Sequence, residues 1–301
     1  MTHKKLPLAP AAIFCTLLWG SAAPFIKWGY GLLHIETTGD ILVFAGLRFM
    51  LAGVLVLCVA KFAFHRRLFQ NGIHVSSVCT LALFQTFAQY WFYYVGISNT
   101  SGVSSAVITG TGAFISLLMS VYIFRYESMT AFKALGCLLG FAGILVMNVS
   151  GMDGFHFVWA GEGLILASQV SAAVSSAFIK KFTQKQDAVL LSGWQFLVGG
   201  TALVLAGMAM GGHVPAPILS GWLVLFYLAF VSGAAYTVWG LLLREYPLSV
   251  VGIYNCIIPI AGVAWSAVLL HETAQALSLN TLAAMVLVAA GVWLVNRRTV
   301  R

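Results

Sequence analysis

Long apolar stretches separated by short polar turns fill almost the whole chain. We count ten of them, each of about twenty residues, the length that a helix needs to cross the roughly 30 Å hydrocarbon core of a bilayer. Only 8% of the 301 residues are charged and 60% are hydrophobic, whereas an average soluble domain has about 25% charged residues. The sequence therefore predicts an all-α integral membrane protein with ten transmembrane helices. The expected ranges are Ala9–Tyr30, Ile41–Ala60, Ile73–Gly96, Val103–Phe124, Phe132–Val149, Phe157–Ile179, Ala188–Met210, Ile218–Leu243, Val250–Leu270 and Leu277–Val295.

Lysine and arginine are confined to one side of the predicted membrane. With the N-terminus in the cytoplasm, fourteen basic residues fall in inner loops and helix ends, and none falls in an outer loop. This positive-inside distribution predicts that both termini are cytoplasmic. The fourteen are Lys4, Lys5, Lys61, Arg66, Arg67, Arg125, Lys133, Lys180, Lys181, Lys185, Arg244, Arg297, Arg298 and Arg301. The outer loops carry the acids Glu36, Asp40, Asp153 and Glu272 instead.

The two halves of the sequence share four short matches in the same order. They pair residues 25–27 with 178–180, 48–53 with 195–200, 126–127 with 271–272, and 143–148 with 291–296. Each half has five predicted helices, an odd number, so the second half would enter the membrane upside down. We therefore expect two inverted five-helix repeats, residues 1–150 and 151–301, with a substrate site near the midplane between them.

One permanent charge, Arg48, lies near the middle of the apolar stretch Asp40–Ala60. A guanidinium does not deprotonate in a protein, and at a helix centre it costs at least about 2.5–3.5 kcal/mol unless it faces a wet cavity or a partner. Arg48 is therefore the leading candidate for a substrate-binding residue that attracts a carboxylate or another anionic group. The alternative is architectural, with Arg48 bound to backbone carbonyls or polar side chains that hold helices together.

Polar and aromatic side chains on other stretches are candidates for the lining of an inner cavity. Gln85, Gln89 and Tyr93 are spaced by four residues and share one helix face, which favours cavity lining, hydrogen bonds between helices or, for Tyr93, the interfacial aromatic belt. The other candidates are Trp19, Ser21, Gln169, Ser232, Tyr236, Trp239, Tyr254 and Asn255. Any single aromatic residue can simply pack in the core, but the set predicts a cavity that binds an organic solute.

Two further charged residues lie within apolar stretches. Lys27 lies at the outer end of the first stretch, where its side chain can reach the lipid headgroups or form a cation at the cavity mouth. Glu162 lies near the outer start of the sixth stretch, and we interpret it as an acid at the membrane interface. We also expect Pro24 and Pro259 to bend their helices, because proline removes a backbone donor.

The sequence contains none of the common motifs of hydrolases, metalloproteases or nucleotide-binding enzymes. Its seven histidines lie at helix ends or in loops, and its five cysteines lack metal-ligand spacing. We therefore expect no catalytic residue, no metal site and no cofactor. The net charge of +8 follows from membrane topology, so a nucleic-acid partner is not expected either. A scaffold without transport activity is a weaker alternative, because it needs no duplicated bundle with a polar lining.

The chain resembles the EamA family of the drug/metabolite transporter superfamily over nearly its whole length. The resemblance rests on Trp19-Gly20-Ser21 followed by Pro24, on Leu47-Arg48-Phe49, and on Pro259 followed thirteen residues later by Glu272. The glycine-containing endings of the fifth and tenth stretches complete the pattern. One position departs from it, because Phe114 stands where the first repeat should have a proline thirteen residues before Glu127. Gly110 and Gly112 lie nearby and are expected to loosen that helix instead.

The resemblance implies ten helices in two inverted repeats, cytoplasmic termini and a central cavity in a bacterial inner-membrane transporter. Characterised members move amino acids and other small metabolites, often outward, so we expect an exporter of such solutes. An importer or facilitator of another small organic solute is the alternative. Small multidrug-resistance proteins of the same superfamily use a glutamate within the membrane, and no acid occupies a helix centre here, which argues against a mainly cationic substrate. The expected partners are a small-molecule substrate and the lipid bilayer; a monomer and a homo-oligomer both remain open.

Overall fold

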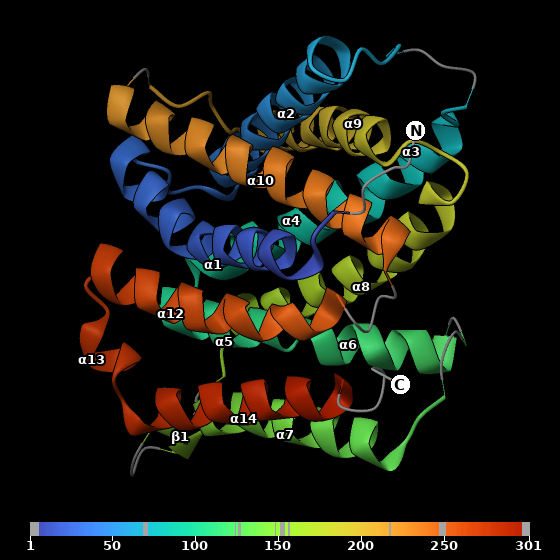
Figure 1. The fold of residues 1–301 in the computed structure, drawn as a ribbon. Coiled ribbons are helices and arrows are strands. Elements are labelled where there is room, and N and C mark those ends of the chain that lie inside the picture. Colours follow the sequence, from blue (N-terminus) through green and yellow to red (C-terminus); the bar gives the residue numbers. More distant parts are fainter. Residues whose placement is uncertain are drawn as a thin grey trace.

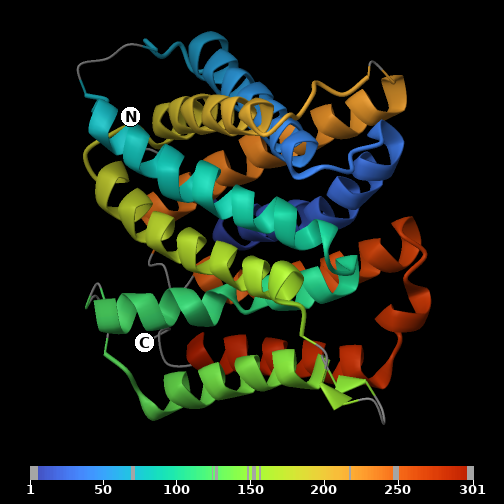
Figure 2. The same cartoon turned by 180° about the vertical axis from the view of Figure 1, so that it is seen from behind.

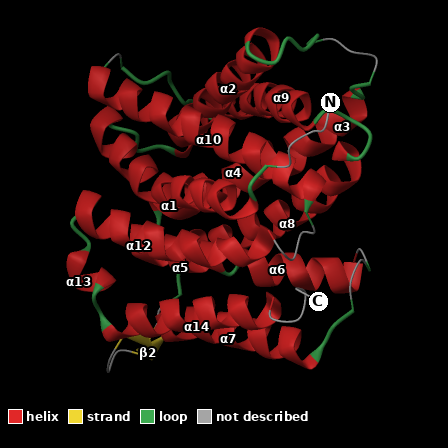
Figure 3. Cartoon of the chain, viewed as in Figure 1, coloured by secondary structure: helices red, strands yellow, loops and turns green. Residues whose placement is uncertain are grey.

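The computed structural model describes residues 6–68, 72–123, 125, 128–147, 149–150, 154–155, 157–216, 218–246 and 251–296. These residues form a bundle of helices, with one short antiparallel pair, β1 (Val149–Ser150) and β2 (Gly154–Phe155) (Figure 3). Of the sequence-based predictions, Lys4, Lys5, Glu127, Asp153, Arg297, Arg298 and Arg301 lie outside the described residues.

Six helical segments of the described chain are long and apolar enough to cross a membrane. They are α1 (Leu8–Leu33), α2 (Thr38–Phe62), α5 with α6 and η2 (Gly102–Ile123), η4 with α8 (Trp159–Thr183), α9 (Ala188–Ala209) and α10 (Leu219–Glu245). Shorter apolar helices are α7 (Ala131–Met147), the segment Tyr254–Leu269 and Leu279–Val295 within α14 (Leu279–Asn296). Apart from the short strand pair, the described chain is thus helical, with the long apolar helices of a membrane protein.

Several of these segments are not regular α-helices. The stretch predicted as Ile73–Gly96 consists of α3 (Val75–Leu81), the π-helical η1 (Ala82–Ala88) and α4 (Gln89–Ser98). η2 (Met119–Ile123) and η4 (Trp159–Gly163) are also π-helical, and the 3-10 turn η5 (Ile253–Cys256) precedes α12 (Ile257–Leu269) and the short α13 (Thr273–Ala276). Such π segments are often found at functional sites.

Polar residues of the short turns cap the N-termini of three helices. The Thr37 side chain accepts a hydrogen bond from Asp40 N at the start of α2, and the Ser101 side chain accepts one from Ser104 N at the start of α5. Asp187 accepts from two backbone amides at the start of α9. These bonds satisfy donors that the first turn of a helix leaves without partners.

The helices pack in pairs that run through the whole bundle. Figures 1 and 2 show α10 on one face, α4 and α8 on the opposite face, and α7 beside α14 along one edge. α1 packs against α10 and α12, and α2 packs against α9. The side chains of one end are rich in lysine and arginine and include the acids Asp187 and Glu245, whereas four other acids lie at the opposite end. We call these the basic end (Lys61, Arg66, Lys180, Lys181, Lys185, Arg244) and the acidic end (Glu36, Asp40, Glu162, Glu272).

Glycines let α2 and α9 approach until their backbones touch. A Cβ atom added at Gly46 would lie 2.6 Å from Gly200 O, and one added at Gly200 would lie 2.7 Å from Met50 N. Small residues at a contact between membrane helices allow this approach, and dispersion then stabilises the pair. The α2–α9 seam therefore fixes the position of α2, the helix that carries Arg48.

Two helices are interrupted where their neighbours meet. α5 ends at Gly110 and α6 begins at Gly112, so the loosening expected at these glycines is confirmed. Pro259 lies in the first turn of α12, a position that tolerates the missing backbone donor. A Cβ atom added at Gly110 would lie 2.9 Å from Pro259 Cγ, so the two interruptions lie against each other. Pro24, in contrast, lies within a continuous α1.

Replacing Gly200 with alanine is expected to lower the midpoint of thermal unfolding in detergent by a few degrees. The added methyl group clashes with the α2 backbone, and overpacking of this kind costs about 1–3 kcal/mol. Gly31→Ala on α1 is the matched control, because an added Cβ there meets nothing within 4 Å. Equal midpoints for the two variants would contradict the close packing of this seam.

Candidate functional site

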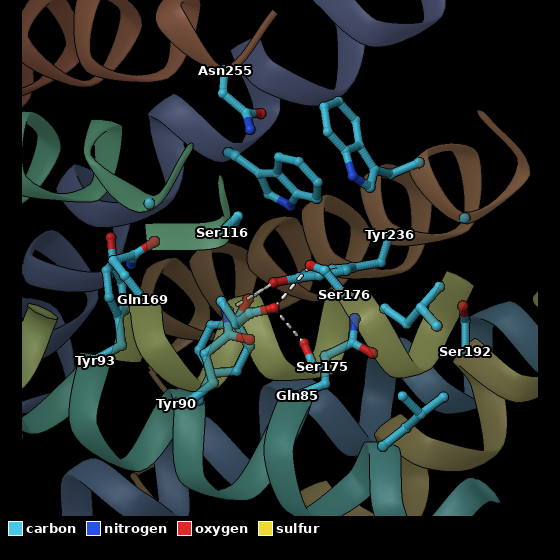
Figure 4. Close-up of a pocket in the computed structure, with 18 of the residues that line it drawn as sticks. Gln85, Tyr90, Tyr93, Ser116, Gln169, Ser175, Ser176, Ser192, Tyr236 and Asn255 are labelled. Atoms are coloured by element: carbon cyan, nitrogen blue, oxygen red, sulfur yellow. Dashed lines mark hydrogen bonds between the residues drawn. The ribbon is translucent and has the colours of Figure 1, made fainter. Parts of the chain in front are cut away.

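A cavity of about 160 Å³ lies inside the bundle, between helices from both halves of the sequence. A cavity of about this size can hold a benzene-sized molecule. Figure 4 shows Asn255 reaching into it from one side, opposite Tyr90 and Gln85. Of the twelve residues predicted to bind substrate, nine line this cavity: Trp19, Arg48, Gln85, Gln89, Tyr93, Gln169, Tyr236, Trp239 and Asn255. Their part in binding a substrate stays a prediction.

The other three predicted residues do not line the cavity. The Ser21 hydroxyl lies 2.7 Å from both Leu18 O and the Tyr227 hydroxyl, so it joins α1 to α10. Ser232 is buried behind the cavity and accepts a hydrogen bond from Arg48. Tyr254 packs at the edge of a hydrophobic cluster that contains Trp239.

The Arg48 guanidinium is almost completely enclosed, with 1% of the residue exposed. Its Nε donates to Leu228 O at 3.0 Å and to Ser232 Oγ at 2.9 Å, and Nη1 donates to the Tyr94 hydroxyl at 2.7 Å. Within the described chain, no carboxylate forms an ion pair with it and no hydrogen bond engages Nη2. The arginine is thus held by dipoles, and part of its donor capacity remains for a ligand.

Aromatic rings surround the same guanidinium. Its Cζ lies 5.1 Å from the ring centroid of Phe49, 5.7 Å from that of Tyr90 and 5.9 Å from that of Tyr94. Rings within about 6 Å stabilise a cation through their negative faces, without neutralising it. Arg48 therefore joins helices, as the architectural interpretation expects, and it also lines the cavity; that it binds a substrate stays a prediction.

Beside this cation, Tyr236 joins α10 to α4 through its hydroxyl group. Its hydroxyl lies 2.5 Å from that of Tyr90 and accepts a hydrogen bond from Gln89 Nε2 at 3.2 Å. The Tyr236 ring also packs on Trp19, with centroids 5.0 Å apart, and on Phe196, with centroids 5.4 Å apart. The cavity therefore has a polar cluster at Arg48 and an aromatic surface beside it.

Tyr90 and Tyr94 are the site residues that the sequence-based predictions missed. They follow Gln89 and Tyr93 by one position each and are spaced by four, so they share a neighbouring face of α4. Ser116, Ser175, Ser176 and Ser192 also contribute to the lining (Figure 4). The spacing of the two tyrosines was the available signal, but only the position of α2 shows that their face meets Arg48.

The cavity extends toward the basic end and stops short of the acidic end. On α8 its lining runs from Gln169 to Thr183, and it continues onto Ala188 at the start of α9. Toward the acidic end, the lining stops at Tyr93 and Ala22. The next turns carry residues with no exposed surface, Ile26, Ile97 and Val103. The packing therefore closes one end of the cavity.

The lysine and the glutamate predicted inside apolar stretches both bind the turn between α4 and α5. Lys27 Nζ donates to Thr100 O at 2.5 Å. Glu162 is buried, and it accepts hydrogen bonds from the Thr100 hydroxyl at 2.5 Å and from Val158 N at 2.9 Å. Among the described residues, no three His, Cys, Asp or Glu side chains are grouped so that they could hold a metal ion.

The model of the EamA-like transporter family matches residues 8–149 and again residues 159–297. The chain belongs to the EamA-like transporter family. It is therefore a multi-pass membrane protein of a transporter family.

Relatives in this family support the same assignment. The chain is 28% identical to the uncharacterized transporter YvbV of Bacillus subtilis, over 98% of this chain and 94% of the relative. It is also 28% identical to a probable amino-acid metabolite efflux pump of Salmonella typhimurium, over 94% of this chain and 92% of the relative. A solved structure titled "Crystal structure of protein" has the same fold, with a TM-score of 0.70 and 18% identity, over 98% of this chain and all of the other.

Replacing Tyr236 with phenylalanine is expected to lower the free energy of unfolding by about 1–3 kcal/mol, because the buried Tyr90 hydroxyl and Gln89 amide lose a partner. The measurement is thermal unfolding of the purified variant in detergent. Tyr122→Phe is the matched control, because Tyr122 is 65% exposed. Equal stability of the two variants would show that the Tyr236 hydroxyl contributes nothing to the bundle.

Proposed function

We propose that this protein is a secondary transporter that exports small carboxylate-bearing metabolites, such as amino acids, by alternating access around its central cavity. The observation that carries the proposal is Arg48. A permanent cation without a carboxylate partner among the described residues lines a cavity inside a membrane bundle. Burying an uncompensated charge is costly, and a substrate carboxylate would supply the missing partner.

The architecture that we propose is ten transmembrane helices in two inverted repeats of five, residues 1–150 and 151–301. The family model matches each half separately, which supports the division. The four sequence matches make α2 equivalent to α9, and α7 equivalent to α14, and these helices pack against each other. Contact between equivalent helices is expected where a two-fold axis runs between repeats. A second contact is also repeated in the two halves. The helix α1 packs against α12, and their equivalents, α8 and α6, pack against each other.

The cavity chemistry favours an anion or a zwitterion over a cation. Arg48 is the one charged residue among those that line the cavity in the described chain, and no acid accompanies it. The amides of Gln85, Gln89 and Gln169 can bind an amino group or a hydroxyl, and the aromatic surface at Trp19 can pack against an apolar side chain. The names of the Salmonella typhimurium and Escherichia coli relatives, probable amino-acid metabolite efflux pumps, agree with this class.

The proposed direction, export, rests on the names of the relatives, and the end toward which the cavity extends is compatible with it. The proposed orientation follows the positive-inside rule, with the basic end and both termini in the cytoplasm. A cavity that approaches this end can take up a cytoplasmic solute before the bundle changes its state. The proposed location is the bacterial inner membrane, with the lipid bilayer and the small molecule as partners. Import or facilitated diffusion of another organic solute is the alternative, and transport measured in both directions separates them.

Arg48→Leu is expected to reduce counterflow of a labelled mixture of amino acids in proteoliposomes by roughly 10- to 100-fold. The reason is that a hydrogen bond to a charged group is worth about 1.5–3 kcal/mol. Arg48→Lys keeps the charge but lacks the planar guanidinium group. Its counterflow rate should therefore lie between those of Arg48→Leu and the unaltered protein. Arg244→Leu, an exposed arginine at the basic end, is the matched control.

The same variants separate binding from architecture. If Arg48 binds the carboxylate, Arg48→Leu loses competition by amino acids in the counterflow assay and keeps competition by their amides. A variant that folds and moves amino acids at the normal rate removes Arg48 from the binding site. Equal losses for acids and amides, together with a lowered unfolding midpoint, would make its role purely architectural. If the unaltered protein shows no saturable counterflow of any amino acid, that result contradicts the proposed function itself.

A further inference from the structure

Three charged side chains from three different elements converge on the turn between α4 and α5, at the acidic end. Lys27 belongs to α1, Glu162 to η4, and Glu272 to the link between α12 and α13. All three bind residues 100–103. They are separated by at least 110 positions in the sequence, so their convergence is a property of the closed bundle.

Glu272 binds the start of α5 with both carboxylate oxygens. Oε1 accepts from Gly102 N at 3.1 Å and Oε2 accepts from Val103 N at 2.9 Å. These amides belong to the first turn of α5, where backbone donors have no helical partner and the helix dipole favours a negative charge. Gln275, beside α12 on α13, adds a hydrogen bond from Nε2 to Ser104 Oγ at 3.3 Å. The link between α12 and α13 is thus joined to the first turn of α5.

Thr100 is held from two other directions. Lys27 binds its carbonyl oxygen and Glu162 binds its hydroxyl, both at 2.5 Å. η4 lies so close that a Cβ atom added at Gly161 would be 2.8 Å from Asn99 O. The turn therefore joins α1, η4 and the link after α12 at one point.

This point lies over the closed end of the cavity. Ile26 is the neighbour of Lys27 on α1, and Ile97 and Val103 flank the turn on α4 and α5. All three have no exposed surface, and along their helices they lie between the cavity-lining residues Ala22, Tyr93 and Thr109 and the turn. Separating α1, η4 and α12 from the turn would uncover these residues and connect the cavity with the acidic end.

The chemistry of these contacts suits repeated opening. Each is a hydrogen bond to a charged group, strong when closed, and water can replace it when the elements separate. Lys27 and Glu272 are only partly buried, so water reaches them without a large rearrangement. An apolar contact in the same place would favour one state alone.

We propose that Lys27, Glu162 and Glu272 form a latch on residues 100–103 that closes the cavity at the acidic end, and that each transport cycle releases it. This inference rests on the proposed alternating access. It predicts that weakening the latch raises the population of the state that is open at the acidic end.

Accessibility of a cysteine in the cavity measures that population directly. Thr109 lines the cavity, and Thr109→Cys in a chain whose five native cysteines are replaced by alanine supplies a single thiol. In whole cells, a membrane-impermeant methanethiosulfonate reagent should label this thiol slowly. Adding Glu272→Gln or Lys27→Met should raise the labelling rate roughly tenfold or more, since each removes charge-assisted bonds of the closed state.

Glu36→Gln is the matched control, because Glu36 is an exposed acid at the same end, outside the latch. Thr100→Val removes only the hydroxyl that binds Glu162 and should give a smaller increase, which keeps the test usable if a charge substitution impairs folding. Labelling that is equal in all three latch variants and in Glu36→Gln would overturn the latch. The readout needs no substrate, so the latch can hold even if amino-acid counterflow fails, and the latch can fail while counterflow persists.

Discussion

The buried guanidinium of Arg48 is the interaction on which the rest of the structure depends. The lipid core cannot solvate a charge that never deprotonates, so the protein must supply a polar environment around it. Here dipoles supply it: a carbonyl oxygen, two hydroxyls and three aromatic rings. Because no acid of the described chain neutralises the charge, the site retains a net attraction for anions. These partners come from α2, α4 and α10, so a change in the packing of any of these helices would remove at least one of them.

Close helix packing surrounds Arg48, whereas other helices of the bundle are interrupted. Gly46 and Gly53 flank Arg48 on α2, and an added Cβ at either would lie within 2.8 Å of the α9 backbone. Because the two backbones are in contact, sliding of α2 along α9 would create clashes. The interrupted elements are elsewhere, at Thr111 between α5 and α6, and at η5 before Pro259. A rigid seam that carries the charge, beside helices with broken hydrogen-bond ladders, is the division of roles that a carrier requires.

The positions of the helices could be read from the sequence, because apolar length and turn residues are local properties. The shared face of Gln85, Gln89 and Tyr93 was equally local. The hydroxyl partners of Arg48 were not, since Tyr94 and Ser232 acquire their roles only when α4 and α10 meet α2. The π-helical form of η1 likewise depends on contacts with a distant helix, α9. Thr86 donates a hydrogen bond to the Gln195 amide oxygen, and Gly199 leaves room for the η1 backbone. Propensity alone gives no reason for a π segment there.

The contrast between the two ends of the cavity follows from the same physics. The acidic end is closed by apolar residues beneath charge-assisted hydrogen bonds, whereas small and polar side chains of α8 and α9 line the way to the basic end. Apolar packing excludes water from the closed end, but alone it gives no means of choosing between states. If directional bonds to one turn are made and lost together, as the proposed latch requires, closure is all-or-none. A carrier needs this property, because a half-closed end would let solute leak past the arginine.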